Sequence, residues 1–199
     1  RDHFDFVAKM VDRGVEVLEL QDLLADVVAK PDSRDWLLDR TVTDDLVGPG
    51  LAREIRAWLT DLSPDRLAEF LIGGVAYQDV VGELDSNFLS LFNELDPAGF
   101  VIRPLPNTQF MRDNSAWIFG GVTLNPMYWP ARRQETLLTT AVYKFHPEFA
   151  DETYEVWLGD ADGPPADHGM ATLEGGDVMP IGKGVVVIGM GERSSHQAI

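Results

Sequence analysis

The middle of this 199-residue chain has the hydrophobic spacing of a series of short helices. Between residues 21 and 95 apolar positions recur every three or four residues, which is the period of an amphipathic helix. The segment "GLAREIRAWLTDL" places one apolar face on Leu51, Ile55, Trp58, Leu59 and Leu62. The next segment offers Ser63 as an N-cap, Pro64 at the first helical position and Gly73 as the stop. We interpret residues 21–95 as an inserted helical domain.

The first twenty residues have the pattern of the closing half of a β/α unit. The segment "DFVAKMVDRG" predicts a helix that stops at Gly14. After it, "VEVLEL" predicts a strand with Val15 and Val17 facing inward and Leu20 as a further inward candidate. Residues 1–20 are therefore expected to be the end of a first module.

From residue 96 onward the pattern changes to strands and turns around one long helix. "SAWIFGGVTLN" predicts strands, "PARRQETLLTTAVYKF" a helix that begins at a proline and ends at His146, and "TYEVWLGD" an alternating strand. "VMPIG", "KG" and "VVVIGM" predict a hairpin with a two-residue turn. Residues 96–199 are therefore expected to contain mixed β and α modules.

Composition narrows the class of protein. The net charge is −17, with 33 acidic and 16 basic residues and no basic stripe, which argues against nucleic acid and anionic membranes as partners. No apolar run is long enough to span a membrane. The chain has no cysteine, which excludes disulfides and thiolate metal sites and suits a reducing compartment. It opens on "RDHFDF" and closes on "HQAI", so we expect both ends to be cut from a longer polypeptide.

Two polar clusters adjoin the predicted strands and the long helix. The first precedes an apolar strand and consists of Asn107, Arg112, Asp113 and Asn114. Its chemistry favours an Asx-capped turn over a binding site. The second places Arg132 and Arg133 in the first turn of the helix, where cations oppose the helix dipole. That placement indicates anion binding, and pairing with Glu135 is the alternative.

Two further clusters lie near the C-terminus. In "LEGGDVMPIG", Glu174 and Asp177 flank a glycine pair within an apolar stretch, and a buried carboxylate is usually paired, hydrogen-bonded or functional. In "GMGERSS", Glu192 and Arg193 indicate either a site or an internal ion pair. Together the clusters offer carboxylates for a cation and arginines for a carboxylate. They predict a site for a zwitterion with a cationic side chain.

The segments "PLPNTQFMRDNSAWIFGG", "NPMYWPARRQETLL", "FHPEFA", "ATLEGGDVMPIG" and "IGMGERSSHQAI" closely resemble bacterial arginine deiminase, in order and within a match that runs from residue 1 to 199. The resemblance implies hydrolysis of L-arginine to L-citrulline and ammonia without a metal or organic cofactor. It implies an α/β fold, a partial five-module α/β propeller of the pentein type with an inserted helical bundle domain. A cytoplasmic location and a homo-oligomer are also expected.

The resemblance also assigns roles to residues. Asp113 is expected to grip the substrate guanidinium, with Glu174 beside it and beside the catalytic histidine; these two are the candidate catalytic residues of the chain. The α-carboxylate and its surroundings are assigned to Asn107, Arg132 and Arg193. Phe110 is expected to line the pocket, and Asp177 to support the site from behind.

Two parts of the family's machinery are missing from the sequence. The family uses a cysteine nucleophile and a histidine in a His-x-Asp motif, whereas this chain has no cysteine and its four histidines do not match the motif. We therefore expect an internal segment: residues 1–20 end the first module, 21–95 form the insert, and 96–199 form the second module and the start of the third. The alternatives are a non-catalytic propeller protein that binds a guanidino compound or a partner, and a deiminase of agmatine or methylated arginine.

Overall fold

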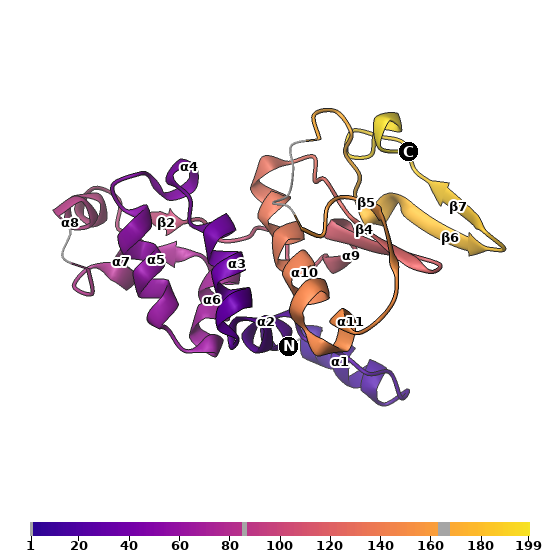
Figure 1. The fold of residues 1–199 in the computed structure, drawn as a ribbon, viewed down its shortest axis with the longest axis horizontal. Coiled ribbons are helices and arrows are strands. Elements are labelled where there is room, and N and C mark those ends of the chain that lie inside the picture. The colour runs from indigo at the N-terminus through magenta and orange to yellow at the C-terminus, as the bar shows by residue number, and fades with distance from the viewer. Residues whose placement is uncertain (1, 85–86, 163–167) are drawn as a thin grey trace.

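The computed structural model describes residues 2–84, 87–162 and 168–199. Short helices fill the N-terminal half of the chain. They are α1 (Asp2–Val11), α2 (Leu20–Val28), α3 (Pro31–Thr41), α4 (Asp44–Val47), α5 (Ala52–Asp61), α6 (Pro64–Gly73), α7 (Tyr77–Val80) and α8 (Asn87–Leu95). Figure 1 shows α3 to α8 gathered on one side of the molecule, with the larger sheets on the other.

The helices predicted between residues 50 and 73 are present, with the predicted signals at their ends. The α5 helix buries Ile55 and Leu59, and the Ser63 hydroxyl caps α6 by accepting a hydrogen bond from the Arg66 N–H at 3.4 Å. Gly74 ends α6 at a φ of +77°, and a Cβ there would lie 2.5 Å from the carbonyl oxygen of Ile102. That close approach accompanies the antiparallel pairing of β1 (Val75–Ala76) with β2 (Phe100–Ile102).

The strand predicted for residues 15–20 is wrong. Residues 15–19 form no strand, and Leu20 begins α2 instead. Val15 is 48% exposed, and Val17 is only partly buried. The alternation of valine with glutamate imitates a strand, but no described strand pairs with this segment. An extended segment becomes a strand only when its N–H and C=O groups bond to a neighbouring strand, and otherwise they are left to solvent.

Two further small sheets follow the helical half. In the larger, β3 (Ser115–Ile118) pairs antiparallel with β4 (Gly121–Leu124), which pairs in parallel with β5 (Glu155–Leu158). The β4–β5 connection contains the turn η1 (Pro130–Arg132), the predicted helix α10 (Arg133–Phe145) and the short helix α11 (Pro147–Ala150). The α10 helix ends at its C-cap His146, as expected. This connection is a βαβ crossover, which parallel strands require.

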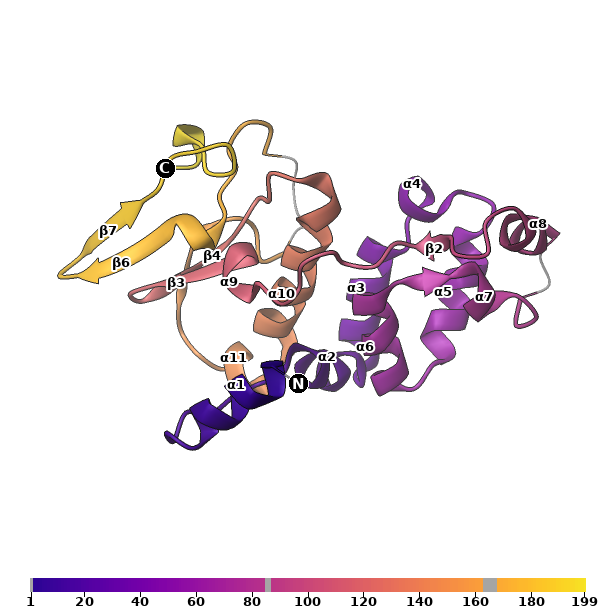
Figure 2. The same cartoon turned by 180° about the vertical axis from the view of Figure 1, so that it is seen from behind.

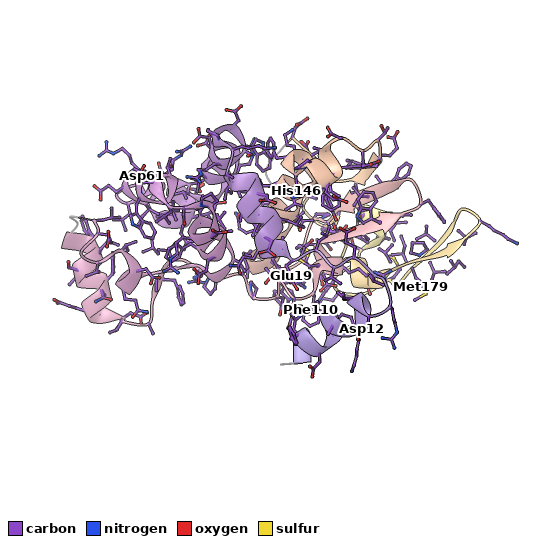
Figure 3. The ribbon with its side chains drawn as sticks, turned by 90° about the horizontal axis from the view of Figure 1, so that it is seen from below. Asp12, Glu19, Asp61, Phe110, His146 and Met179 are labelled. Carbon is purple, nitrogen blue, oxygen red and sulfur yellow. The ribbon has the colours of Figure 1, made fainter. Side chains whose placement is uncertain are left out.

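The predicted hairpin is also present. β6 (Val178–Gly182) and β7 (Val185–Ile188) are antiparallel, and the two turn residues Lys183 and Gly184 have φ values of 52° and 77°. Positive φ at both positions is the signature of a type I′ turn. The hairpin projects from the body of the molecule, and Figure 3 shows Met179 on it.

The main hydrophobic core joins the two halves. It contains Leu24, Leu37, Ile55 and Leu67 from the N-terminal helices together with Leu137, Leu138, Ala141 and Val142 of α10. Figures 1 and 2 both show α10 between these helices and the β3–β5 sheet. The helix therefore links the helical half to the strand ends that carry the polar clusters.

The α/β class is confirmed, since helices and sheets share one chain and a parallel crossover is present. Among the described residues the strands form sheets of two, three and two strands, and none of these closes. The propeller and the division into residues 1–20, 21–95 and 96–199 remain predictions.

Candidate functional site

Asp113 lies in a single helical turn, α9 (Met111–Asn114), which leads directly into β3. Asn125, just after β4, fixes this turn: its backbone N–H donates to the Asn114 carbonyl at 2.9 Å, and its side-chain amide donates to the Asp113 carbonyl at 2.7 Å. The Asn114 side chain is buried and accepts a hydrogen bond from Thr139. Asn114 is thus a structural residue, whereas the Asp113 side chain remains 20% exposed.

Arg132 occupies the centre of the polar clusters and is only 3% exposed. Its Nη1 donates to Oδ2 of Asp113 at 2.9 Å and lies 3.5 Å from Oε2 of Glu174. Its Nε and Nη2 donate to the carboxylate of Glu135 at distances from 2.8 to 3.2 Å. The pairing with Glu135, one of the two interpretations of this segment, is therefore present. Burial works against the charged form of Arg132, but the hydrogen bonds to Glu135 and Asp113 outweigh it and raise the pKa of the guanidinium.

Glu135 also reaches the loop that carries Asn107. Its Oε1 accepts a hydrogen bond from the Asn107 backbone N–H at 3.1 Å, while the Asn107 carbonyl lies 3.5 Å from Nη2 of Arg132. Glu135 lies in the first turn of α10 and is 1% exposed. The loop before α9 and the start of α10 are thus joined through one buried carboxylate.

Glu174 reaches the same site because two glycines follow it. A Cβ on Gly175 would lie 1.9 Å from the carbonyl oxygen of Arg112, and one on Gly176 would lie 2.9 Å from Oδ1 of Asp113. The Nε of Arg112 in turn donates to the Gly175 carbonyl at 3.2 Å. The glycine pair, in the 3₁₀ turn η2 (Gly175–Asp177), therefore lets this backbone press against α9.

Asp177 contacts Glu174 indirectly, through a serine that the sequence analysis did not single out. Ser194 is fully buried; its hydroxyl donates to Oδ2 of Asp177 at 2.6 Å and accepts from the Glu174 backbone N–H at 3.1 Å. Asp177 is thus linked to Glu174 through Ser194, and its role as support for the site stays a prediction. The only sequence signal for Ser194 is its position next to Arg193.

Arg193 completes an ion-pair network of five side chains. Its Nη1 donates to Oε2 of Glu174 at 2.9 Å, and this hydrogen bond raises the pKa of its guanidinium. Its side chain is 47% exposed, in contrast to the buried Arg132. The network links Asp113, Arg132, Glu135, Glu174 and Arg193. Three carboxylates and two guanidiniums leave it with a net charge of −1.

One buried carboxylate oxygen in this network has no donor among the described residues. Oε1 of Glu174 is buried and accepts no hydrogen bond from the described residues, while Oε2 receives Arg193. A buried polar atom without a partner costs roughly 1–3 kcal/mol. A ligand N–H that reached this oxygen would recover that energy, so the network is suited to a cation that donates hydrogen bonds.

The structure therefore brings most of the predicted site residues together. Asn107, Asp113, Arg132, Glu174 and Arg193 are connected by hydrogen bonds and ion pairs. Phe110, the N-cap of α9, is 52% exposed and lies near the middle of the molecule in Figure 3. Glu135 was considered in the sequence only as a partner for the arginines, and its contact with Asn107 has no sequence signal because it spans 28 positions.

Two classes of site are absent within residues 2–84, 87–162 and 168–199. No group of three or more His, Asp or Glu side chains there is arranged to hold a metal ion. No helix in these ranges has both the length and the apolar character that a membrane span requires.

A comparison with protein families identifies the family of this chain. The family model described as arginine deiminase matches residues 1–199. The match includes the helical half as well as the segments that carry Asp113, Arg132, Glu174 and Arg193. The chain belongs to the arginine deiminase family.

Proposed function

We propose that this site binds L-arginine in an enzyme that hydrolyses it to L-citrulline and ammonia. The observation that supports the proposal most is the partly buried network with a net charge of −1, in which Oε1 of Glu174 has no donor among the described residues. L-arginine carries a net charge of +1 and presents N–H donors at its guanidinium. Substrate and network are thus complementary in charge and in hydrogen bonding.

In this proposal Asp113 and Glu174 hold the guanidinium and orient its central carbon. A thiolate attacks that carbon, ammonia leaves with a proton from a histidine, and water hydrolyses the resulting amidino-cysteine. Fixed carboxylates keep the positive charge in place while the carbon becomes tetrahedral. The thiol must come from outside this sequence, because the 199 residues contain no cysteine.

The α-carboxylate is assigned to Arg193, Arg132 and the Asn107 loop. Arg193 is half-exposed, and among the described residues its one ion pair is with Glu174, so a carboxylate arriving from solvent can reach its guanidinium. Arg132 already donates to Glu135 and Asp113, so it has to exchange the Asp113 contact before it can engage a carboxylate. Phe110 then covers the aliphatic part of the substrate. Cytoplasmic location and homo-oligomer formation belong to the same proposal.

The test is citrulline formation by an intact polypeptide that contains residues 1–199. We expect citrulline from L-arginine, and loss of turnover in Asp113→Asn, which keeps the shape of the side chain and removes its charge. The 199-residue chain alone should produce none above a heat-killed control, because it lacks the nucleophile. Binding of L-arginine without turnover by the intact polypeptide would favour the non-catalytic alternative, and turnover of agmatine or methylated arginine in preference would change the substrate.

A further inference from the structure

Glu135 is committed to Arg132 more completely than any other carboxylate of the network. Its Oε2 accepts hydrogen bonds from both Nε and Nη2 of Arg132, its Oε1 accepts one from Nε, and its side chain is wholly buried. Arrangements in which both carboxylate oxygens meet one guanidinium are among the strongest ion pairs in proteins. Through Oε1 it also accepts the backbone N–H of Asn107.

Arg132 is a competitor for the carboxylates that the substrate needs. Its Nη1 lies 2.9 Å from Oδ2 of Asp113 and 3.5 Å from Oε2 of Glu174. Without Glu135, the whole charge of Arg132 would be compensated by these two side chains, in a buried site where charges are weakly screened. The net charge of the network would then rise from −1 to zero.

We propose that Glu135 is the charge-balancing residue of the site: it takes up the charge of Arg132, so that Asp113 and Glu174 keep unneutralised charge for the guanidinium of the substrate. It is a positioning residue, since it acts through Arg132 and the Asn107 loop. The inference rests on the proposed function, because it concerns the same site. In this inference the affinity of the site for cations depends on the carboxylate of Glu135, although Glu135 itself does not contact the substrate.

The experiment compares Glu135→Gln with wild type in an intact polypeptide that contains residues 1–199, using three ligands. L-arginine and agmatine both carry the guanidinium cation, whereas L-citrulline shares the α-amino acid group and has a neutral side chain. We expect the KM of both cations to rise by the same factor, about tenfold or more. The inhibition constant of citrulline should stay within about twofold, since no charge on its side chain is lost.

A purely structural role gives a different result. If Glu135→Gln weakens citrulline as much as the two cations, or leaves all three unchanged, the inference is wrong. Glu135→Asp keeps the charge, and it should preserve the ratio of arginine KM to citrulline inhibition constant even where turnover falls. Failure of the wild type to make citrulline would instead contradict the proposed function, whatever the variants do.

Glu135→Gln leaves Arg132 buried with less compensation, which endangers folding. The double variant Arg132→Met with Glu135→Gln removes both charges and restores a net charge of −1. Its KM for agmatine should be lower than that of Glu135→Gln. If Glu135→Gln does not fold, the comparison is with wild type, and the KM of the double variant should lie within about threefold of the wild-type value. An agmatine KM at least tenfold above wild type in the double variant would overturn the inference.

Discussion

One glycine decides how closely two segments of the site approach each other. Gly175 lies against the backbone of Arg112, where a Cβ would stand 1.9 Å from a carbonyl oxygen. The obstacle is main chain and cannot rotate away. Because Glu174 precedes this glycine directly, the spacing of the backbones also fixes the distance between Glu174 and Asp113.

Gly175→Ala should therefore destabilise the protein and displace Glu174. Overpacking a tight contact costs about 1–3 kcal/mol, so we expect the free energy of unfolding, measured with denaturant, to fall by at least this amount. Gly191→Ala is the matched control, since a Cβ there meets nothing within 4 Å. Equal midpoints and slopes for the two variants would show that the backbone at Gly175 shifts freely.

Arg193 offers the cleanest test of the carboxylate assignment. Hydrogen bonds to charged groups contribute roughly 1.5–3 kcal/mol, so Arg193→Ala should lower kcat/KM for L-arginine by about tenfold to a hundredfold. Agmatine lacks the carboxylate, so its kcat/KM should not fall. Arg66→Ala is a suitable control, because Arg66 is also about half-exposed and paired with one carboxylate, Glu69. Equal losses for arginine and agmatine in Arg193→Ala would remove this residue from the carboxylate site.

At the scale of elements, the sequence predicted correctly the helices and turns that are specified by residues close together in the chain. The α5 and α6 helices show their apolar faces and cap in the sequence, and the type I′ turn at Lys183 and Gly184 is a two-residue property. The strand expected at residues 15–20 failed because a strand also needs a partner edge, and a single segment carries no information about one.

For the site, too, the sequence indicates the residues but not the contacts between distant segments. The carboxylates and arginines stand out in the sequence because they interrupt apolar segments, and the resemblance ordered them into roles. Their connections lie outside local patterns: Ser194 meets Glu174 across 20 positions, and Glu135 meets Asn107 across 28. Such contacts depend on how α9, α10 and η2 pack.

At the scale of the whole molecule, α10 makes the two halves interdependent. Leu137 and Leu138 lie in the same buried cluster as Leu24 and Leu37, and the same helix begins with Glu135. Packing of the helical half therefore bears on the position of the site, although its own helices supply none of the site residues.

The outer face of the β6–β7 hairpin is apolar and exposed to solvent. Met179, Ile181, Val185 and Val187 are each 49–60% exposed. In β6 and β7 they alternate with less exposed residues, so they share one face, while Val178 and Ile188 turn toward the second hydrophobic cluster. A contiguous apolar face on a two-stranded sheet with open edges favours association with another such surface.

We therefore expect the chain to self-associate as its concentration rises, and Ile181→Lys with Val187→Lys to shift it toward monomer by placing charges on that face. Neither position is part of the buried core, so the melting temperature should change little. Leu18→Lys provides the control, because Leu18 is 44% exposed in the segment between α1 and α2, away from the hairpin in sequence. Sedimentation velocity across a concentration series measures the effect. If the double variant associates as strongly as the Leu18→Lys control, some other surface holds the copies together.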